Sequence, residues 1–462
     1  MIYNMNFMRR YLLMFILLGL IAQGYSQDKK VILKLSISEA QAFALQNNRE
    51  IQSSKIDIMS ADKKVWETIA TGLPQLNLAA NYLHQFVVPQ LSFGPVLDVN
   101  SLPDGFLTKN DIKNAYVDSP PISLGVRNNT TIDFTVSQLI FNGEYIVGLQ
   151  AIKTLKRISE KSLVKTEDHT KESVADTYYL ILVLGENARV LNESLKSIDQ
   201  TYNELVKMNQ QGLNEETDVD QIKISKSNIQ TLITSLESQM GISMKLLKYQ
   251  LGVGFDQVIE LTDSLPGIIQ QGNIQYLSSP EFNVNNSVDY QMVSIQEKVS
   301  ALMLKREKSK YLPTVSAFYR HEEQTNQPSF NFAVKDVVGA TLSLPITSSG
   351  MRNSKVSQAK FDLEKSQLAR ETAEQGLIME FETAKSNYQT AFSNFNTNTE
   401  SMNLSKKVYD KTVIKYKEGV SSSFELTQNQ NQFLTAESNY YTSVLSLLNA
   451  KAKLDRILSS SK

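Results

Sequence analysis

The chain of 462 residues is long enough for two or three ordinary domains, or for one long architecture built twice. Its formal charge of -1 does not suggest a nucleic-acid partner, and none is expected. The absence of cysteine excludes a disulfide framework, thiol catalysis and Cys-based zinc sites. The three histidines, His84, His169 and His321, are isolated in the sequence, so we interpret them as surface or interface residues and expect no metal and no cofactor.

Residues 1–26 have the pattern of a secretory signal peptide. Arg9 and Arg10 precede an apolar stretch that ends at Ala22 and is shorter than the roughly 20 residues of a membrane-spanning helix. Cleavage is expected between Ser26 and Gln27, after small residues. The mature protein is therefore predicted to be exported. No later segment is apolar enough for a transmembrane helix, so a membrane-spanning part must consist of strands.

Two pairs of strands are predicted, each after a helical segment that ends just before a Leu-Pro dipeptide. In the first strand Leu76 and Leu78 alternate with Asn77, which gives one apolar face. Such a pattern fits either a soluble antiparallel sheet or a sheet between lipid and water. The export signal and the aromatic residues near the strand ends favour the membrane. The helical segments cover 38–71 and 284–310, the strands cover 74–93, 128–141, 312–321 and 332–346, and the aromatic residues are Phe86, Phe93, Tyr319, Phe330 and Phe332. Residues 94–127, rich in Pro, Asp and Asn, are expected to form a long irregular connection.

Four long helices are predicted from apolar residues that recur at alternating steps of three and four. A helix of the length of the first one would extend about 100 Å, far more than a globular domain needs. The helices are expected at 143–211, 217–250, 350–418 and 423–458. The apolar seam consists of Ile181, Leu184, Ala188, Leu191, Leu195, Ile198, Tyr202 and Leu205 in the first helix, of Val219, Ile222, Ile229, Ile233, Leu236, Met240 and Leu247 in the second, and of Leu426, Asn429, Phe433, Ala436, Tyr440, Ser443, Leu447, Ala450 and Leu454 in the fourth.

An internal repeat relates the two halves of the chain. A shift of 207 residues places Gly212 on Gly419 without a gap over roughly a hundred residues. Each copy therefore contains a helix, two strands, a long helix, a short turn and a returning helix. The first copy is assigned to 27–251 and the second to 284–462, with a linker or equatorial segment at 252–283.

The strand count predicts an oligomer if the strands cross a membrane. An open sheet edge in hydrocarbon leaves backbone groups unpaired, and the smallest spanning barrels have about eight strands. Four strands per chain are too few, so several chains must share one barrel. Cyclic symmetry is the ordinary solution, and three chains would supply twelve strands and twelve helices.

Nearly the whole mature chain resembles the TolC-like outer-membrane efflux family, the outer membrane factors. The resemblance is carried by the duplicated element order, by "LSISEAQAFALQNNREI", the Leu-Pro strand openings and "QLIFNG", and by the paired turns "QQGLNEETDVDQ" and "KEGVSSSFELTQ". It implies a mainly α fold with a small membrane β part: a trimeric α-helical barrel continuous with a shared 12-stranded β-barrel. It also implies an exit duct in the cell outer membrane with its helical part in the periplasm. The implied partners are two further copies of the chain, a periplasmic adaptor (membrane fusion protein), an inner-membrane transporter and outer-membrane lipid.

The resemblance also implies roles for residues at the two turns. The adaptor-docking tip would comprise Gly212, Leu213, Gly419 and Val420, and the pore constriction or gate would comprise Asp218, Tyr416, Glu425 and Gln428. Ser421 stands where the best-known member has an arginine, so the same salt bridge at the tip is not available.

Helix capping is the alternative interpretation of the acidic residues. Ser422 with Glu425 has the spacing of a capping box, and Asp218 with Gln221 is similar. Both roles can coexist, because a threefold axis turns one acidic residue into a ring of three.

Three function classes were compared for an exported helical chain: a duct, a structural protein and an enzyme. An efflux or type I secretion duct is passive, and its specificity lies in the transporter. An exported coiled-coil structural or adhesion protein is the alternative, although such a rod has no use for two pairs of amphipathic strands. An enzyme is not expected, because the sequence has no P-loop, dinucleotide fingerprint, HExxH or Gly-x-Ser-x-Gly motif.

Overall fold

Two compact units make up the part of the chain that the structure describes. The computed structural model describes residues 32–101, 105, 108–118, 120–271, 282–327, 331 and 333–459. One unit, here called the sheet unit, comprises residues 57–160 and 292–371, and the helical unit comprises the other described residues. The predicted signal peptide (1–26) and the residues Phe330 and Phe332 lie outside the described part. None of the described helices combines the length and the low polarity that a membrane crossing requires.

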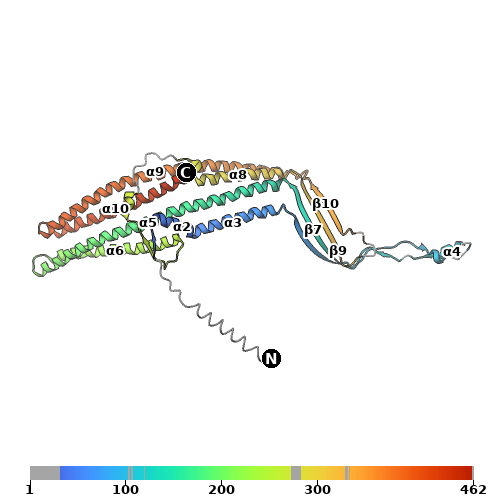
Figure 1. Ribbon diagram of the computed structural model, residues 1–462, viewed down its shortest axis with the longest axis horizontal. Coiled ribbons are helices and arrows are strands. Elements are labelled where there is room, and N and C mark those ends of the chain that lie inside the picture. Colours follow the sequence, from blue (N-terminus) through green and yellow to red (C-terminus); the bar gives the residue numbers. More distant parts are fainter. Residues whose placement is uncertain are drawn as a thin grey trace, which may run out of the picture. The chain divides into compact units, whose positions relative to one another are not determined.

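The sheet unit contains one antiparallel sheet of four long strands in the order β10-β9-β7-β2 (Figure 1). Within each repeat the two strands pair with each other, and β7 with β9 joins the first repeat to the second. Only one side of β2 and one side of β10 are therefore paired within this sheet. The strands cover Gln75–His84 (β2), Asn128–Asn142 (β7), Thr314–Gln324 (β9) and Asp336–Ser343 (β10).

The register of the sheet separates an apolar face from a polar face. Residues that are paired across neighbouring strands lie on the same face. One such row across all four strands is apolar or aromatic, and it consists of Leu76, Val136, Tyr319 and Val338. The adjacent row contains Asn77, Thr135 and Arg320 with Val337. The period-two pattern of the sequence therefore holds in this part of the sheet, whereas the next row of the apolar face places Leu78 and Phe134 beside His321 and Asp336.

The connection between β2 and β7 differs from the prediction. Strand β2 ends at His84 and not near residue 93, and the following chain forms two short antiparallel pairs, β3 with β6 and β4 with β5. These pairs and α4 replace part of the irregular connection expected at 94–127. The short strands cover Gln90–Leu91 (β3), Val96–Leu97 (β4), Tyr116–Val117 (β5) and Ile122–Ser123 (β6), with η1 at Val99–Ser101 and α4 at Lys109–Asn114.

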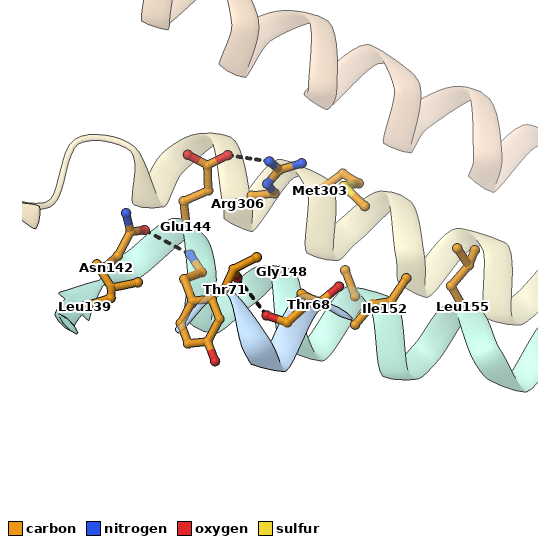
Figure 2. Close-up of a pocket in the computed structure, with 12 residues that line it drawn as sticks. Thr68, Thr71, Leu139, Asn142, Glu144, Gly148, Ile152, Leu155, Met303 and Arg306 are labelled. Carbon is orange, nitrogen blue, oxygen red and sulfur yellow. Dashed lines mark hydrogen bonds and ion pairs between the residues drawn. The ribbon is translucent and has the colours of Figure 1, made fainter. Parts of the chain in front are cut away.

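The start of α5 is fixed at the end of the sheet by the residues of the "QLIFNG" motif. Asn142 caps the helix, since its Oδ1 accepts a hydrogen bond from the backbone N–H of Tyr145 at 2.9 Å. A Cβ on Gly143 would lie 2.7 Å from Cδ1 of Leu312, so glycine permits this close approach. Figure 2 shows the adjacent pocket of about 440 Å³, in which Glu144 forms an ion pair with Arg306 of α8.

The long helices follow the predicted bounds to within one residue. They cover Gly143–Gln210 (α5), Glu216–Leu251 (α6), Met351–Lys417 (α9) and Ser423–Ser459 (α10), and α8 covers Val288–Ser309. Helices α5, α6, α9 and α10 share one apolar core in the helical unit, which includes Ile198, Ile229, Tyr409 and Phe433.

The helix predicted at 38–71 is in fact two helices, α2 (Ile37–Asn47) and α3 (Arg49–Ala70). Asn48 separates them with an extended backbone, and its Oδ1 accepts the N–H of Glu50 at 2.8 Å, which starts α3. Its amide also donates to the carbonyl of Gln250 at 2.7 Å. Within the predicted linker 252–283, β8 (Ile259–Leu261) is parallel to β1 (Leu33–Leu35), and α7 (Leu265–Gln271) follows. The short helix η2 covers Val284–Asn286.

Candidate gate at the two helical turns

The two turns that were predicted from the repeat have the same backbone geometry. In the first, Leu213 N–H donates to Met208 C=O at 3.0 Å and Gly212 N–H donates to Asn209 C=O at 2.9 Å. In the second, Val420 N–H donates to Lys415 C=O at 2.9 Å, and Gly419 N–H donates to Tyr416 C=O at 3.0 Å. Both patterns are Schellman motifs, which satisfy carbonyls at the ends of α5 and α9.

Glycine is required at both turns by the backbone and not by crowding. Gly212 has φ 71° and Gly419 has φ 73°, in the left-handed region where a Cβ is strained. A Cβ added at either position would meet no heavy atom within 4 Å. The neighbouring side chains Leu213 and Val420 are 66% and 73% exposed, so each turn presents an apolar residue to its surroundings.

The two turns are connected through a buried serine of the second copy. Ser423, 5% exposed, donates its hydroxyl proton to Oδ1 of Asp218, and its oxygen lies 3.0 Å from Oε1 of Gln221. Asp218 and Gln221 belong to α6, whereas Ser423 is the first residue of α10. This contact, here called the clasp, fastens the first helical hairpin to the second at the end of the helices.

A cleft of about 820 Å³ next to the clasp contains the predicted gate residues Asp218 and Tyr416. Burial, and then the negative charge of Asp218, raise the pKa of Tyr416 to about 12, so the phenol is neutral at physiological pH. The charged residues that line the cleft are Glu204, Glu215, Asp218, Lys417 and Glu418. Four acids against one base make the cleft negative, which favours cations over anions there.

Glu425 and Gln428 lie on the first turns of α10 and are exposed. The Glu425 carboxylate accepts a hydrogen bond from Ser421 Oγ at 2.6 Å, and its backbone N–H donates to Ser422 Oγ at 3.2 Å. The first half of the predicted capping box is therefore present, but the carboxylate binds Ser421 instead of the Ser422 backbone. Ser421 thus positions Glu425 by a neutral hydrogen bond.

The capping interpretation of Asp218 and Gln221 is wrong. The N-cap of α6 is Glu215, which makes no side-chain capping bond, and Asp218 is already inside the helix. Its carboxylate instead accepts a hydrogen bond from the Ser423 hydroxyl. A long-range contact of this kind has no local sequence pattern, which is why capping was the more obvious interpretation.

Three buried polar residues of α10 were missed by the sequence analysis. Ser423, Gln430 and Glu437 are 5%, 1% and 2% exposed, whereas the predicted seam residues Asn429 and Ala436 are only half-buried. The buried face of α10 is therefore wider than the predicted seam, of which Leu426, Phe433 and Leu447 are also buried. A possible signal was the spacing of seven residues between these three polar positions, which places them on one side of a helix.

Comparisons with known proteins agree with this architecture. Residues 304–460 match the family described as outer membrane efflux protein. The search of curated proteins gave no match. Among solved structures, the outer membrane protein VceC of Vibrio cholerae is 13% identical with a TM-score of 0.68, and 91% of this chain and 95% of VceC are covered.

Two further outer membrane channels have the same fold. The MtrE channel of Neisseria gonorrhoeae, in its open state, is 14% identical with a TM-score of 0.71, and 94% of this chain and 93% of MtrE are covered. The CmeC channel of Campylobacter jejuni is 14% identical with a TM-score of 0.70, and the coverage is 92% and 86%. The predicted resemblance to outer-membrane efflux proteins is confirmed by the sequence match of residues 304–460, and the solved structures share the fold over nearly the whole chain.

Proposed function

We propose that this protein is the outer-membrane exit duct of a tripartite efflux or type I secretion system. It would conduct substrates passively from an inner-membrane transporter and a periplasmic adaptor to the outside of the cell, without catalysing a reaction. The observation that carries this proposal is an amphipathic four-stranded sheet with two open edges in a chain whose other unit consists of long paired helices. The family match at residues 304–460 supports the same function.

The open edges of the sheet are the reason to propose a trimer. An unpaired edge costs several kcal/mol for each backbone group in hydrocarbon, so β2 of one copy must pair with β10 of the next. Three copies of four strands close a twelve-stranded barrel, and the long helices continue as a tunnel. In this arrangement the sheet lies in the outer membrane, and the helical part lies in the periplasm.

The two turns are proposed as the periplasmic end of the tunnel. Exposed Leu213 and Val420, presented by Gly212 and Gly419, would provide apolar contacts for the adaptor. Asp218 and Tyr416 would line the constriction, and Glu425 and Gln428, which are exposed on α10, would face the same passage. The clasp between Ser423 and Asp218 holds the two hairpins together, and its opening would widen the passage.

The alternative of an exported coiled-coil rod without a channel is not supported by the comparisons. The solved structures that match nearly the whole chain are outer membrane channels, and their likeness includes the sheet as well as the helices.

Mass measurement and conductance together test the proposal. The purified chain in detergent is expected to be a trimer, and after reconstitution into planar bilayers it should form water-filled channels. A stable, folded monomer, or a trimer that conducts no ions even after the clasp is removed by Ser423→Ala, would overturn the duct.

A further inference from the structure

A cavity of about 410 Å³ in the helical unit is separate from the proposed gate. Its walls are formed by α5, α7, α9 and α10. This volume lies within the range of small-molecule sites, roughly 300–1,000 Å³. No residue of the cavity is among those assigned above to the tip or to the constriction.

Glu437 of α10 is a buried acid that lines this cavity. Its side chain is 2% exposed, and among the described residues neither of its carboxylate oxygens has a hydrogen-bond partner. A buried carboxylate without a partner is costly, because it has lost water and gained nothing in exchange. The side chain borders an empty volume large enough for a ligand, and both carboxylate oxygens are covered by the atoms around them.

The bases at this cavity are already neutralised by other acids. Arg189 of α5 binds Glu186 at 2.7 Å and Glu193 at 2.6 Å. Lys406 of α9 forms an ion pair with Asp410 at 3.0 Å, and it makes no hydrogen bond with the Glu437 carboxylate. The remaining titratable groups that face Glu437 are the phenols Tyr440 and Tyr441, and α7 contributes only Leu265, Pro266, Ile269 and Gln270. The negative charge of Glu437 therefore has no ion-pair partner among the bases that line the cavity.

The rest of the wall is suited to an apolar ligand. Phe433, Tyr440 and Tyr441 contribute aromatic rings from α10, and Leu265 and Ile269 contribute aliphatic groups from α7. Aromatic rings attract cations through their electron-rich faces, most strongly where water is excluded. An acid within an apolar and aromatic wall selects a ligand that has one positive charge and a hydrophobic body.

We propose that this cavity binds a lipophilic organic monocation, with its charge next to the Glu437 carboxylate and its apolar groups against α7 and the α10 aromatic residues. The site goes beyond the duct function, because it lies in the wall formed by four helices and away from the proposed gate. It does not require a trimer, an adaptor or an open passage.

The same geometry makes the proposed binding dependent on pH. Burial raises the pKa of Glu437 to about 7, although the nearby Lys406 charge lowers it. A proton and an organic cation therefore compete for the carboxylate. The affinity for the cation should rise as the pH increases from 6 to 8, by up to tenfold per unit below the pKa.

Binding of tetraphenylphosphonium to the purified full-length protein tests the proposal. Equilibrium dialysis with the radiolabelled cation in detergent, corrected for micelle partition with excess unlabelled cation, should give one saturable site per chain. Glu437→Gln keeps the shape and removes the charge, so the affinity at pH 8 should fall at least tenfold and lose its pH dependence. Glu400→Gln removes an exposed acid from α9 outside the cavity and should bind like the unaltered protein.

Tetraphenylborate, which has nearly the same shape and the opposite charge, should not bind saturably. Ile269→Trp fills the cavity but keeps Glu437, and it should also abolish binding. Equal affinities of the unaltered protein and Glu437→Gln, saturable binding of the borate, or the absence of saturable phosphonium binding would each overturn the site. The exit duct would stand after any of these results, because the assay requires no conduction.

Discussion

The two helical hairpins have identical turns but different chemistry around them. The shift of 207 residues that superimposes Gly212 on Gly419 also places Asp218 on Glu425 and Glu216 on Ser423. Asp218 is half-buried and held by Ser423 of the other hairpin, whereas Glu425 is exposed and held by Ser421 of its own turn. The two copies therefore share the backbone geometry of the turn but differ in the position of the acidic residue. In the first copy this residue connects the two hairpins, and in the second copy it is exposed to solvent.

The returning helices differ in the residues that they bury. Helix α6 buries Ile222 and Ile229 completely, and the repeat places these on Asn429 and Ala436 of α10. Helix α10 instead buries Gln430 and Glu437, one position further along. The same heptad spacing thus supports an apolar interface in one copy and a partly polar interface in the other. Turn geometry is copied with the local sequence, but the buried face is set by the neighbouring helices.

The largest effect on export and stability is expected from substitutions of the two turn glycines, where the copies have the same backbone geometry. Gly419→Val forces a β-branched residue into φ 73°, at a cost of roughly 1–3 kcal/mol, and the distorted tip should reduce export at least tenfold. Gly212→Val should lower the free energy of unfolding by a similar amount, since its φ is 71°. Export by cells and thermal unfolding would measure both effects. Gly241→Ala, in the interior of α6 with no atom within 4 Å, is the control and should stabilise by about 1 kcal/mol. Normal export by Gly419→Val would show that this turn is not the docking tip.

The next largest effect is the pH dependence of stability that is due to Glu437, a buried acid with no counterpart in the first copy. The pKa of Glu437 is raised from 4.5 to about 7 on folding, so the native state binds more protons than the unfolded state between these values. Stability should therefore fall as the pH rises from about 4.5 through 7. Glu437→Gln removes this penalty and should stabilise the protein by roughly 2–3 kcal/mol at pH 8 but not at pH 4. Thermal unfolding of both proteins across this range is the measurement, and parallel pH profiles would contradict the assignment.

Breaking the clasp should have a moderate effect. Ser423→Ala removes the donor to Asp218 and should cost about 1–2 kcal/mol, because a half-buried carboxylate loses a hydrogen bond. If the clasp restricts the passage, single-channel conductance should also increase. Ser421→Ala removes the corresponding contact of exposed Glu425 and should cost less than about 0.5 kcal/mol, which makes it the matched control. Equal conductance in the two variants would separate the clasp from gating.

The smallest effect on stability is expected at Glu425, which a threefold axis would turn into a ring of three carboxylates. Glu425→Gln keeps a side-chain oxygen that accepts the hydrogen bond from Ser421, so folding should hardly change. Cation selectivity and block by divalent or trivalent cations should both decrease, because the ring attracts cations. The selectivity of the unaltered channel should itself be modest, since Gln428 supplies no second ring. Identical selectivity and block in planar bilayers would mean that Glu425 only holds Ser421 and does not face the passage.

The sequence by itself determined the features that depend on local interactions. Apolar periodicity, the repeat and the glycines at 212 and 419 located the four long helices and both turns, because helix periodicity and left-handed caps are encoded within a few residues. The alternation of apolar and polar residues within each strand likewise indicated which side chains form the apolar face of the sheet. It also carried the family resemblance, which supplied the gate and tip residues.

Only the tertiary structure decided which distant residues meet. The strand order places β7 next to β9. Asp218 accepts a hydrogen bond from Ser423 and does not cap its own helix. Helices α2 and α3 are separated at Asn48, whose side-chain amide donates to the carbonyl of Gln250. The tertiary structure also buried Gln430 and Glu437 where the apolar pattern indicated Asn429 and Ala436. A polar residue gives no hydrophobic signal, and the side of a helix that becomes buried depends on the helices around it. The sequence therefore located the two turns, whereas the clasp and the cavity beside Glu437 required the assembled helices.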